Sequence, residues 1–200
     1  RLEAQVVDYL LDTADVLCVT LTALDGEIVR DRTFDLAVID EACQTTEPAC
    51  WIPILRSGRI VLAGDHCQLP PTVVSVDAAR DGFDVSLLER LMRSPLGDIA
   101  RRLDVQYRMH DAIMQFSSRE FYDGTLIAAD HVREHLLHDL PNVGPHELTS
   151  SPVLFIDTAG ASYDEELEPD GESRRNPGEA DVVRRQVQSL LDAGLAPDQI

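Results

Sequence analysis

Two adjacent carboxylates close an apolar run in the first quarter of the sequence. The run "FDLAVIDEA", residues 34–42, ends in Asp40 and Glu41. Carboxylate oxygens suit Mg²⁺, which keeps several waters when a protein binds it. A second carboxylate beside the first can orient or deprotonate an attacking water. The pair therefore predicts metal-assisted hydrolysis, or else two solvated acids that cap the next helix.

A second segment, "GDHCQLPP", follows the next apolar run. Its Gly64 and Asp65 end that run, and Asp65 can accept hydrogen bonds from polar groups nearby. Gln68 carries both a donor and an acceptor, so its side chain can contact a phosphate oxygen and a water together. Pro70 and Pro71 fix the backbone and remove two donors, which predicts a stiff exit from the site. The alternative is a proline-rich turn that binds no ligand.

A third segment, "QYRMH", places an aromatic ring beside a guanidinium at the end of another predicted strand. Arg108 is planar and permanently charged, which suits a phosphate. Tyr107 offers a ring on which a base can stack. Both residues could instead belong to an ordinary exposed strand end.

The elements that must position these segments alternate between helix and strand. Apolar spacing predicts helices over 2–13, 47–55, 84–92, 111–122, 131–140 and 178–192, and strands over 16–22, 34–42, 60–63, 99–106 and 153–157. Such alternation predicts a doubly wound α/β fold with parallel sheets flanked by helices. Ligands bind at the carboxyl ends of parallel strands, where the acids lie.

The pattern restarts once along the chain. The segment "SPLGD", residues 94–98, is a plausible linker, so we expect one domain over 1–98 and a second over 99–200. Residues 162–178 are polar, acidic and contain Pro and Gly, which predicts a mobile surface loop.

The charge balance is strongly acidic. Asp and Glu number 36 against 17 basic residues, all of them Arg, which gives a net charge of -19. Such a charge argues against a nucleic-acid partner. It is equally a trait of proteins in a salty cytoplasm, where molar salt shortens the reach of like charges to ~3 Å. No apolar run reaches the ~18 residues of a membrane-spanning helix, so no membrane partner is expected.

The four cysteines predict free thiols. Cys18, Cys43, Cys50 and Cys67 form no C-x-x-C pair, and no His lies at zinc-finger spacing. His66 is adjacent to Cys67, but neighbouring residues in a turn rarely bind one metal. Free thiols are typical of a reducing cytoplasm, which is the expected location.

The three segments, in this order, closely resemble superfamily 1B helicases. "VIDEACQ" is similar to helicase motif II, a Walker B segment; "GDHCQLPP" is similar to motif III; and "QYRMHDAIMQFSS" is similar to motif IV. The nearest branch is that of the immunoglobulin mu-binding protein 2 and nonsense-mediated-decay helicases. The resemblance implies parts of two RecA-like P-loop NTPase domains, which use ATP and Mg²⁺. It also implies a monomeric motor that moves 5′ to 3′ on single-stranded DNA or RNA.

The resemblance also implies roles for the nucleotide-facing residues. Asp40 would bind Mg²⁺ through water, and Glu41 would activate the hydrolytic water. Gln68 would sense the γ-phosphate and link it to the nucleic-acid strand. Tyr107 would stack on the adenine, and Arg108 would act as an arginine finger. ATP would sit between the two domains.

Further roles follow from the same resemblance. Gly64 and Asp65 would support the nucleotide-sensing segment. The residues implied in nucleic-acid contact are Thr20, Thr22, Pro70 and Pro71. Thr22 is equally well explained as a strand residue satisfied by a neighbour.

One family feature is missing from the sequence. No G-x-x-x-x-G-K-[ST] segment occurs, and the chain contains no Lys. We expect the phosphate cradle upstream of residue 1 and the late helicase motifs downstream of residue 200. The alternatives are a nucleic-acid-binding module without ATPase activity, and a nuclease or repair protein built on the same core.

Overall fold

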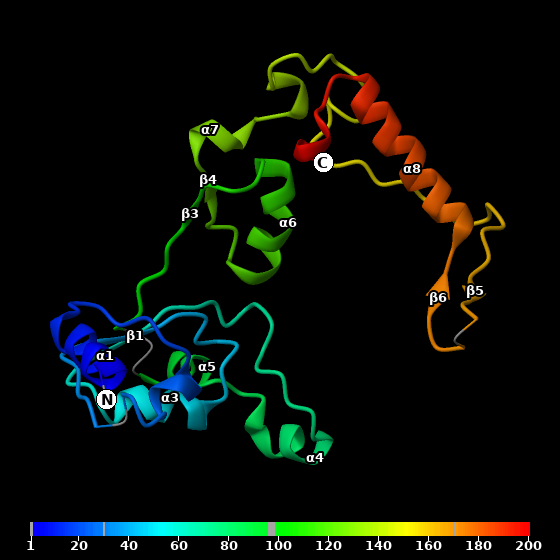
Figure 1. The fold of residues 1–200 in the computed structure, drawn as a ribbon. Coiled ribbons are helices and arrows are strands. Elements are labelled where there is room, and N and C mark those ends of the chain that lie inside the picture. Colours follow the sequence, from blue (N-terminus) through cyan, green and yellow to red (C-terminus); the bar gives the residue numbers. More distant parts are fainter. Residues whose placement is uncertain (1, 30, 96–98, 170) are drawn as a thin grey trace. The chain divides into compact units, whose positions relative to one another are not determined.

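The computed structural model describes residues 2–29, 31–95, 99–169 and 171–200, with side chains from residue 5 onward. The chain divides into two compact units, Arg1–Arg101 and Arg102–Ile200, and each is described by itself (Figure 1). Three residues of the predicted linker, 96–98, lie outside the described residues.

A short parallel sheet forms the centre of the first unit. Strand β1 (Ala37–Ile39) pairs with β2 (Ile60–Leu62), and the register places Ile39 beside Leu62. Helix α3 (Glu47–Ile54) forms the crossover between them. The predicted mixed α/β class with parallel strands and helices is confirmed for this part of the chain. Because the strands are parallel, their carboxyl ends lie at the same edge.

The core of this unit lies between the sheet and two helices. Ile39, Ala42, Cys50 and Leu87 are buried together. Leu87 begins helix α5 (Leu87–Met92), whose Leu88 and Leu91 pack against the same cluster. Burying a leucine side chain of this kind contributes roughly 1.5–3 kcal/mol. The core therefore holds α3 and α5 beneath the two strands that carry the acidic segments.

Four other described helices belong to the first unit. Helix α1 (Leu2–Thr13) is long, whereas α2 (Leu21–Leu24), α4 (Val76–Ala78) and η1 (Ala79–Phe83) are short. In Figure 1, α4 lies apart from α3 and α5, at the end of a long extended connection. Gly82, with φ of 91°, interrupts η1 with a kink, and the sequence analysis predicted no helix over 76–83.

The predicted strand over 16–22 is wrong. Residues 16–20 pair with no described strand, and residues 21–24 form α2. The Thr20 hydroxyl accepts the backbone N–H of Ala23 at 3.2 Å, which caps the helix. Hydroxyl side chains of this kind compete with strand pairing, because they satisfy local backbone donors.

The second unit contains another short parallel pair and a long helix. The elements are β3 (Val105–Gln106), α6 (Asp111–Phe121), β4 (Ile127–Ala128), α7 (Asp130–Arg133), η3 (Leu137–Asp139), β5 (Glu166–Leu167), β6 (Arg174–Arg175), α8 (Pro177–Asp192) and η4 (Pro197–Gln199). Strand β3 pairs in parallel with β4, and α6 connects them. Asn176 caps α8 by accepting the N–H of Glu179 at 3.0 Å.

Three predictions for the second unit need correction. The strand over 99–106 is reduced to β3, and 153–157 forms no strand, because no described strand pairs with it; Phe155 remains 86% exposed. The helix over 131–140 is interrupted, because Asp139 Oδ2 accepts the N–H of Leu136 at 2.8 Å and starts a new turn.

The predicted mobile loop over 162–178 contains an antiparallel hairpin. Leu167 pairs with Arg174 in the β5–β6 register. Arg175 contacts Glu166 across the strands at 3.0 Å, and Arg174 contacts Glu165 at 3.1 Å. Opposite charges that face each other across strands stabilise such pairs.

Among the described helices, no helix has both the length and the apolar composition of a membrane span.

Candidate functional site

The segments that follow β1 and β2 lie directly against each other. The N–H of Ala42 donates to Ala63 O at 2.8 Å. A Cβ on Gly64 would lie 3.0 Å from Ala42 N and 3.1 Å from Cys43 N. Glycine is therefore favoured at this position, because a side chain would push the two backbones apart by a few tenths of an ångström. The structure brings the Asp40–Glu41 and Gly64–Asp65 segments together.

Glu41 adopts an uncommon backbone conformation at this edge. Its φ is 50°, in the left-handed region that residues other than glycine seldom occupy. The Asp40 carboxylate accepts the N–H of Glu41 at 3.0 Å. The side-chain amide of Gln44 donates to Glu41 Oε2 at 2.9 Å. Backbone strain of this kind costs of order 1–3 kcal/mol and is concentrated at functional sites.

The carboxylate of Asp65 organises the turn that carries Gln68. Asp65 Oδ1 accepts the N–H of Cys67 at 3.1 Å, and Oδ2 accepts the Gln68 side-chain amide at 2.9 Å. The backbone N–H of Gln68 also donates to Asp65 O at 3.1 Å. Asp65 therefore positions Gln68, which is itself exposed. Beyond the turn, Pro70 is exposed and Pro71 is buried.

An ion pair ties α3 to α5 beneath these segments. Arg90 donates from Nε to Glu47 Oε2 at 2.7 Å and from its terminal nitrogen to Oε1 at 2.6 Å. The hydrogen bonds from Arg90 lower the pKa of Glu47. Burial raises the pKa of the neighbouring Cys50 thiol, which favours its inert neutral form. Helix α3 begins six residues after Glu41, so this ion pair fixes the helix that follows the acidic segment.

The predicted nucleic-acid residues Thr20 and Thr22 are exposed, and their hydroxyls lie 3.3 Å apart. The Thr20 hydroxyl also caps α2. This local bond accounts for Thr20 structurally, and the predicted contact with nucleic acid stays a prediction for both residues.

In the second unit, Gln106 shapes the turn that presents Tyr107 and Arg108. Gln106 Oε1 accepts the N–H of Arg108 and of Met109, each at 2.8 Å. Tyr107 is 67% exposed, and its ring centroid lies 5.8 Å from that of His131. Arg108 is exposed, and its guanidinium pairs with none of the described carboxylates. Both side chains are thus available for a ligand.

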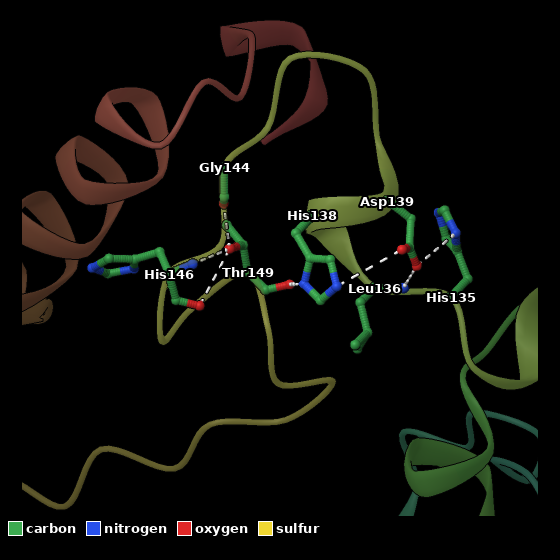
Figure 2. A network of polar contacts seen from close by, with 7 residues as sticks. All are labelled: His135, Leu136, His138, Asp139, Gly144, His146 and Thr149. Carbon is green, nitrogen blue, oxygen red and sulfur yellow. Dashed lines mark hydrogen bonds and ion pairs between the residues drawn. The ribbon is translucent and has the colours of Figure 1, made fainter.

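A polar network elsewhere in the second unit has a structural role (Figure 2). Buried Thr149 donates to Gly144 O at 2.8 Å and accepts the N–H of His146 at 2.8 Å. His138 Nδ1 lies 3.0 Å from Thr149 O, and its Nε2 lies 3.8 Å from Asp139. These bonds join η3 to the loop that follows it. None of the predicted site residues takes part.

Four of the residues that shape the site were missed by the sequence reasoning. They are Gln44, Gln106 and the paired Glu47 and Arg90. Gln44 follows Glu41 by three residues, a spacing at which side chains of one turn can meet, and this was a usable signal. Arg90 was not predictable in this role, because it lies 43 residues from Glu47 in the sequence. A hollow of about 530 Å³ at the start of α8, lined by Asp157, Tyr163 and Glu179 among others, contains no predicted site residue.

Two family models, each described as an AAA domain, match residues 1–76 and 83–200. The chain therefore belongs to the AAA-domain family, and its predicted resemblance to superfamily 1 helicases is confirmed. It is 45% identical over 204 residues to DNA-binding protein SMUBP-2 of Rattus norvegicus, covering 100% of this chain and 20% of that protein.

Two other proteins are also similar to this chain over nearly all of its length. DNA polymerase alpha-associated DNA helicase A of Schizosaccharomyces pombe is 38% identical over 206 residues, covering 100% of this chain and 30% of that protein. The Regulator of nonsense transcripts 1 homolog of Drosophila melanogaster is 41% identical over 198 residues, covering 96% of this chain and 16% of that protein. The chain thus spans less than a third of the length of these relatives.

Proposed function

We propose that this chain forms the central part of an ATP-dependent helicase motor of superfamily 1B. The proposal includes parts of two RecA-like domains, residues 1–98 and 99–200, and 5′ to 3′ movement on single-stranded DNA or RNA. We also propose that the motor is monomeric and acts in the cytoplasm. The family membership supports this function. The observation that carries it is the close packing of Gly64 on Ala42, which joins the two acidic segments at one sheet edge.

The residues of this edge fit Mg²⁺ but do not form a complete phosphate cradle. Asp40 is exposed, and its Oδ1 holds the N–H of Glu41. Its other oxygen makes no hydrogen bond with a described residue, so it is available to a water on Mg²⁺. The chain contains no Lys, so the lysine of a P-loop is not among these residues. ATP with Mg²⁺ would supply the phosphoryl group that is transferred to water.

In this mechanism, each side chain has a distinct role. Glu41 takes the proton from the attacking water, and Gln44 holds the carboxylate in position for this step. Gln68 contacts the phosphate while Asp65 holds its amide. Arg108 stabilises the charge that develops on the phosphate in the transition state.

Tyr107 completes the proposed nucleotide contacts by stacking on the adenine. Its exposed ring and its neighbour His131 support this role. Thr20 and Thr22 would contact phosphates of the bound nucleic acid. The Pro70–Pro71 segment would transmit the state of Gln68 toward that nucleic-acid strand. Contacts of this kind tolerate any base, which is consistent with either DNA or RNA.

The test is the Glu41→Gln variant of the full-length protein. The substitution keeps the size of the side chain and removes the base, so ATP should still bind while single-turnover hydrolysis falls ~10²–10⁴-fold. Glu120→Gln, on an exposed residue of α6, is the matched control and should hydrolyse ATP at the parent rate. A parent protein that binds single strands but hydrolyses no ATP would favour the binding-module alternative.

A further inference from the structure

Three different metal-binding side chains converge in the turn after β2. One ligand atom each from Asp65, His66 and Cys67 lie within 4.8 Å of one another. Cys67 Sγ is 3.9 Å from His66 Nε2. Consecutive side chains point to opposite faces in a strand, so adjacency alone disfavours chelation. Here the Asp65 carboxylate accepts the N–H of Cys67 and folds the backbone, which brings the three groups to one side.

The separation of these atoms suits a small tetrahedral cation. Zinc bonds of about 2.3 Å to sulfur and about 2.0–2.1 Å to imidazole nitrogen place the two ligands ~3.6 Å apart. A rotation of the exposed His66 side chain is enough to close the gap from 3.9 Å. Thiolate and imidazole ligands select Zn²⁺ over Mg²⁺, which prefers oxygen.

We propose that Asp65, His66 and Cys67 form a zinc-binding site within the Gln68 turn. The three side chains bind one Zn²⁺, water fills the fourth position, and the Cys67 thiol releases its proton to solvent. Asp65 and Cys67 are partly exposed and His66 is exposed, so the ion enters directly from solution. The strongly acidic chain, with a net charge of -19, raises the local concentration of divalent cations.

Zinc at this site competes with the bond that positions Gln68. Both Asp65 oxygens already accept N–H groups, from Cys67 and from the Gln68 side chain. A cation bound to Asp65 Oδ2 withdraws electron density from the bond to the Gln68 side chain and repels the positive N–H end of that amide, while the Oδ1 bond to Cys67 keeps the turn folded. Zinc occupancy therefore releases Gln68 and inhibits ATP hydrolysis. This inhibitory effect rests on the proposed function, whereas the metal site itself does not.

Cobalt titration of the full-length protein tests the site independently of activity. Co²⁺ replaces Zn²⁺ and gives a near-ultraviolet charge-transfer band when a thiolate binds it. We expect this band in the parent and in Cys18→Ser, which alters an exposed thiol elsewhere. The band should be lost in Cys67→Ser, and the affinity should fall at least about tenfold in His66→Ala. Absence of the band in the parent, or its survival in Cys67→Ser, would overturn the proposal.

Zinc inhibition of strand-stimulated ATPase tests the consequence. Each variant is compared with its own rate without zinc, and circular dichroism confirms that it is folded. We expect the inhibiting zinc concentration to rise at least about tenfold in Cys67→Ser and to stay unchanged in Cys18→Ser. Equal inhibition of Cys67→Ser and the parent would refute the coupling to Gln68. A parent without ATPase activity would refute the proposed function, and the cobalt band would still decide the metal site.

Discussion

Gly64→Ala tests whether the close approach of the two acidic segments is needed for catalysis. The added Cβ would lie 3.0 Å from Ala42 N and 3.1 Å from Cys43 N. Both are backbone atoms that cannot rotate away. Restoring ordinary contact needs a displacement of ~0.4 Å, and overpacking of this kind costs roughly 1–3 kcal/mol.

The same displacement moves Glu41 relative to Gln68. A misplacement of 1 Å costs about 10²-fold in rate. If the logarithm of the rate scales with distance, a shift of ~0.4 Å lowers kcat roughly 5–10-fold. We would measure the free energy of unfolding by urea titration and kcat by single-strand-stimulated ATP hydrolysis of the full-length protein.

Gly58→Ala is the matched control, because its Cβ would lie 3.5 Å from the nearest atom, Asp35 O, in ordinary contact. We expect its unfolding free energy to stay within about 0.5 kcal/mol of the parent value. The reasoning is refuted if Gly64→Ala matches Gly58→Ala in both stability and kcat.

Three further predictions concern single contacts. Gln44→Ala frees the Glu41 carboxylate, so kcat should fall while ATP affinity, measured by equilibrium titration, stays near the parent value. Arg108→Ala should lower kcat by ~10³–10⁵-fold with little change in ATP binding, and Arg108→Lys should rescue poorly, because an ammonium lacks the planar fork. Because hydrogen bonds from Arg90 lower the pKa of Glu47, their stabilisation is complete above the ordinary value of 4.5 and is lost as the pH falls through the lowered pKa. Glu47→Gln should therefore flatten the acid limb of stability against pH in urea titrations.

Each of these predictions has a contrary outcome, and the Arg108 prediction also has a matched control. Arg119→Ala removes another exposed arginine of the second unit and should leave kcat unchanged. If Arg108→Ala is folded and as active as the parent, Arg108 has no catalytic role and is an ordinary exposed residue at the end of a strand. A Gln44→Ala rate equal to the parent rate would show that Glu41 needs no support from that amide. An unchanged acid limb in Glu47→Gln would exclude the α3–α5 ion pair as its source.

The sequence alone was enough to predict the family, the α/β class and the helices with strong local signals. Helices α1, α3, α6 and α8 lie where apolar spacing places them, within one or two residues. Their caps and apolar faces are local, so each is encoded by neighbouring residues. The motif order likewise identified the candidate acids, because they follow apolar runs at a recognisable spacing.

Only the tertiary structure decided how the candidate residues meet. The φ of 50° at Glu41 and the contact of Gly64 with Ala42 join segments more than 20 residues apart, and no local pattern encodes that distance. The short strands have the same cause, because a strand exists only where a neighbour pairs with it. The convergence of Asp65, His66 and Cys67 depends on the hydrogen bonds by which Asp65 folds the turn. Local propensity determines the helices, whereas the strands and the geometry of the site are set by long-range packing.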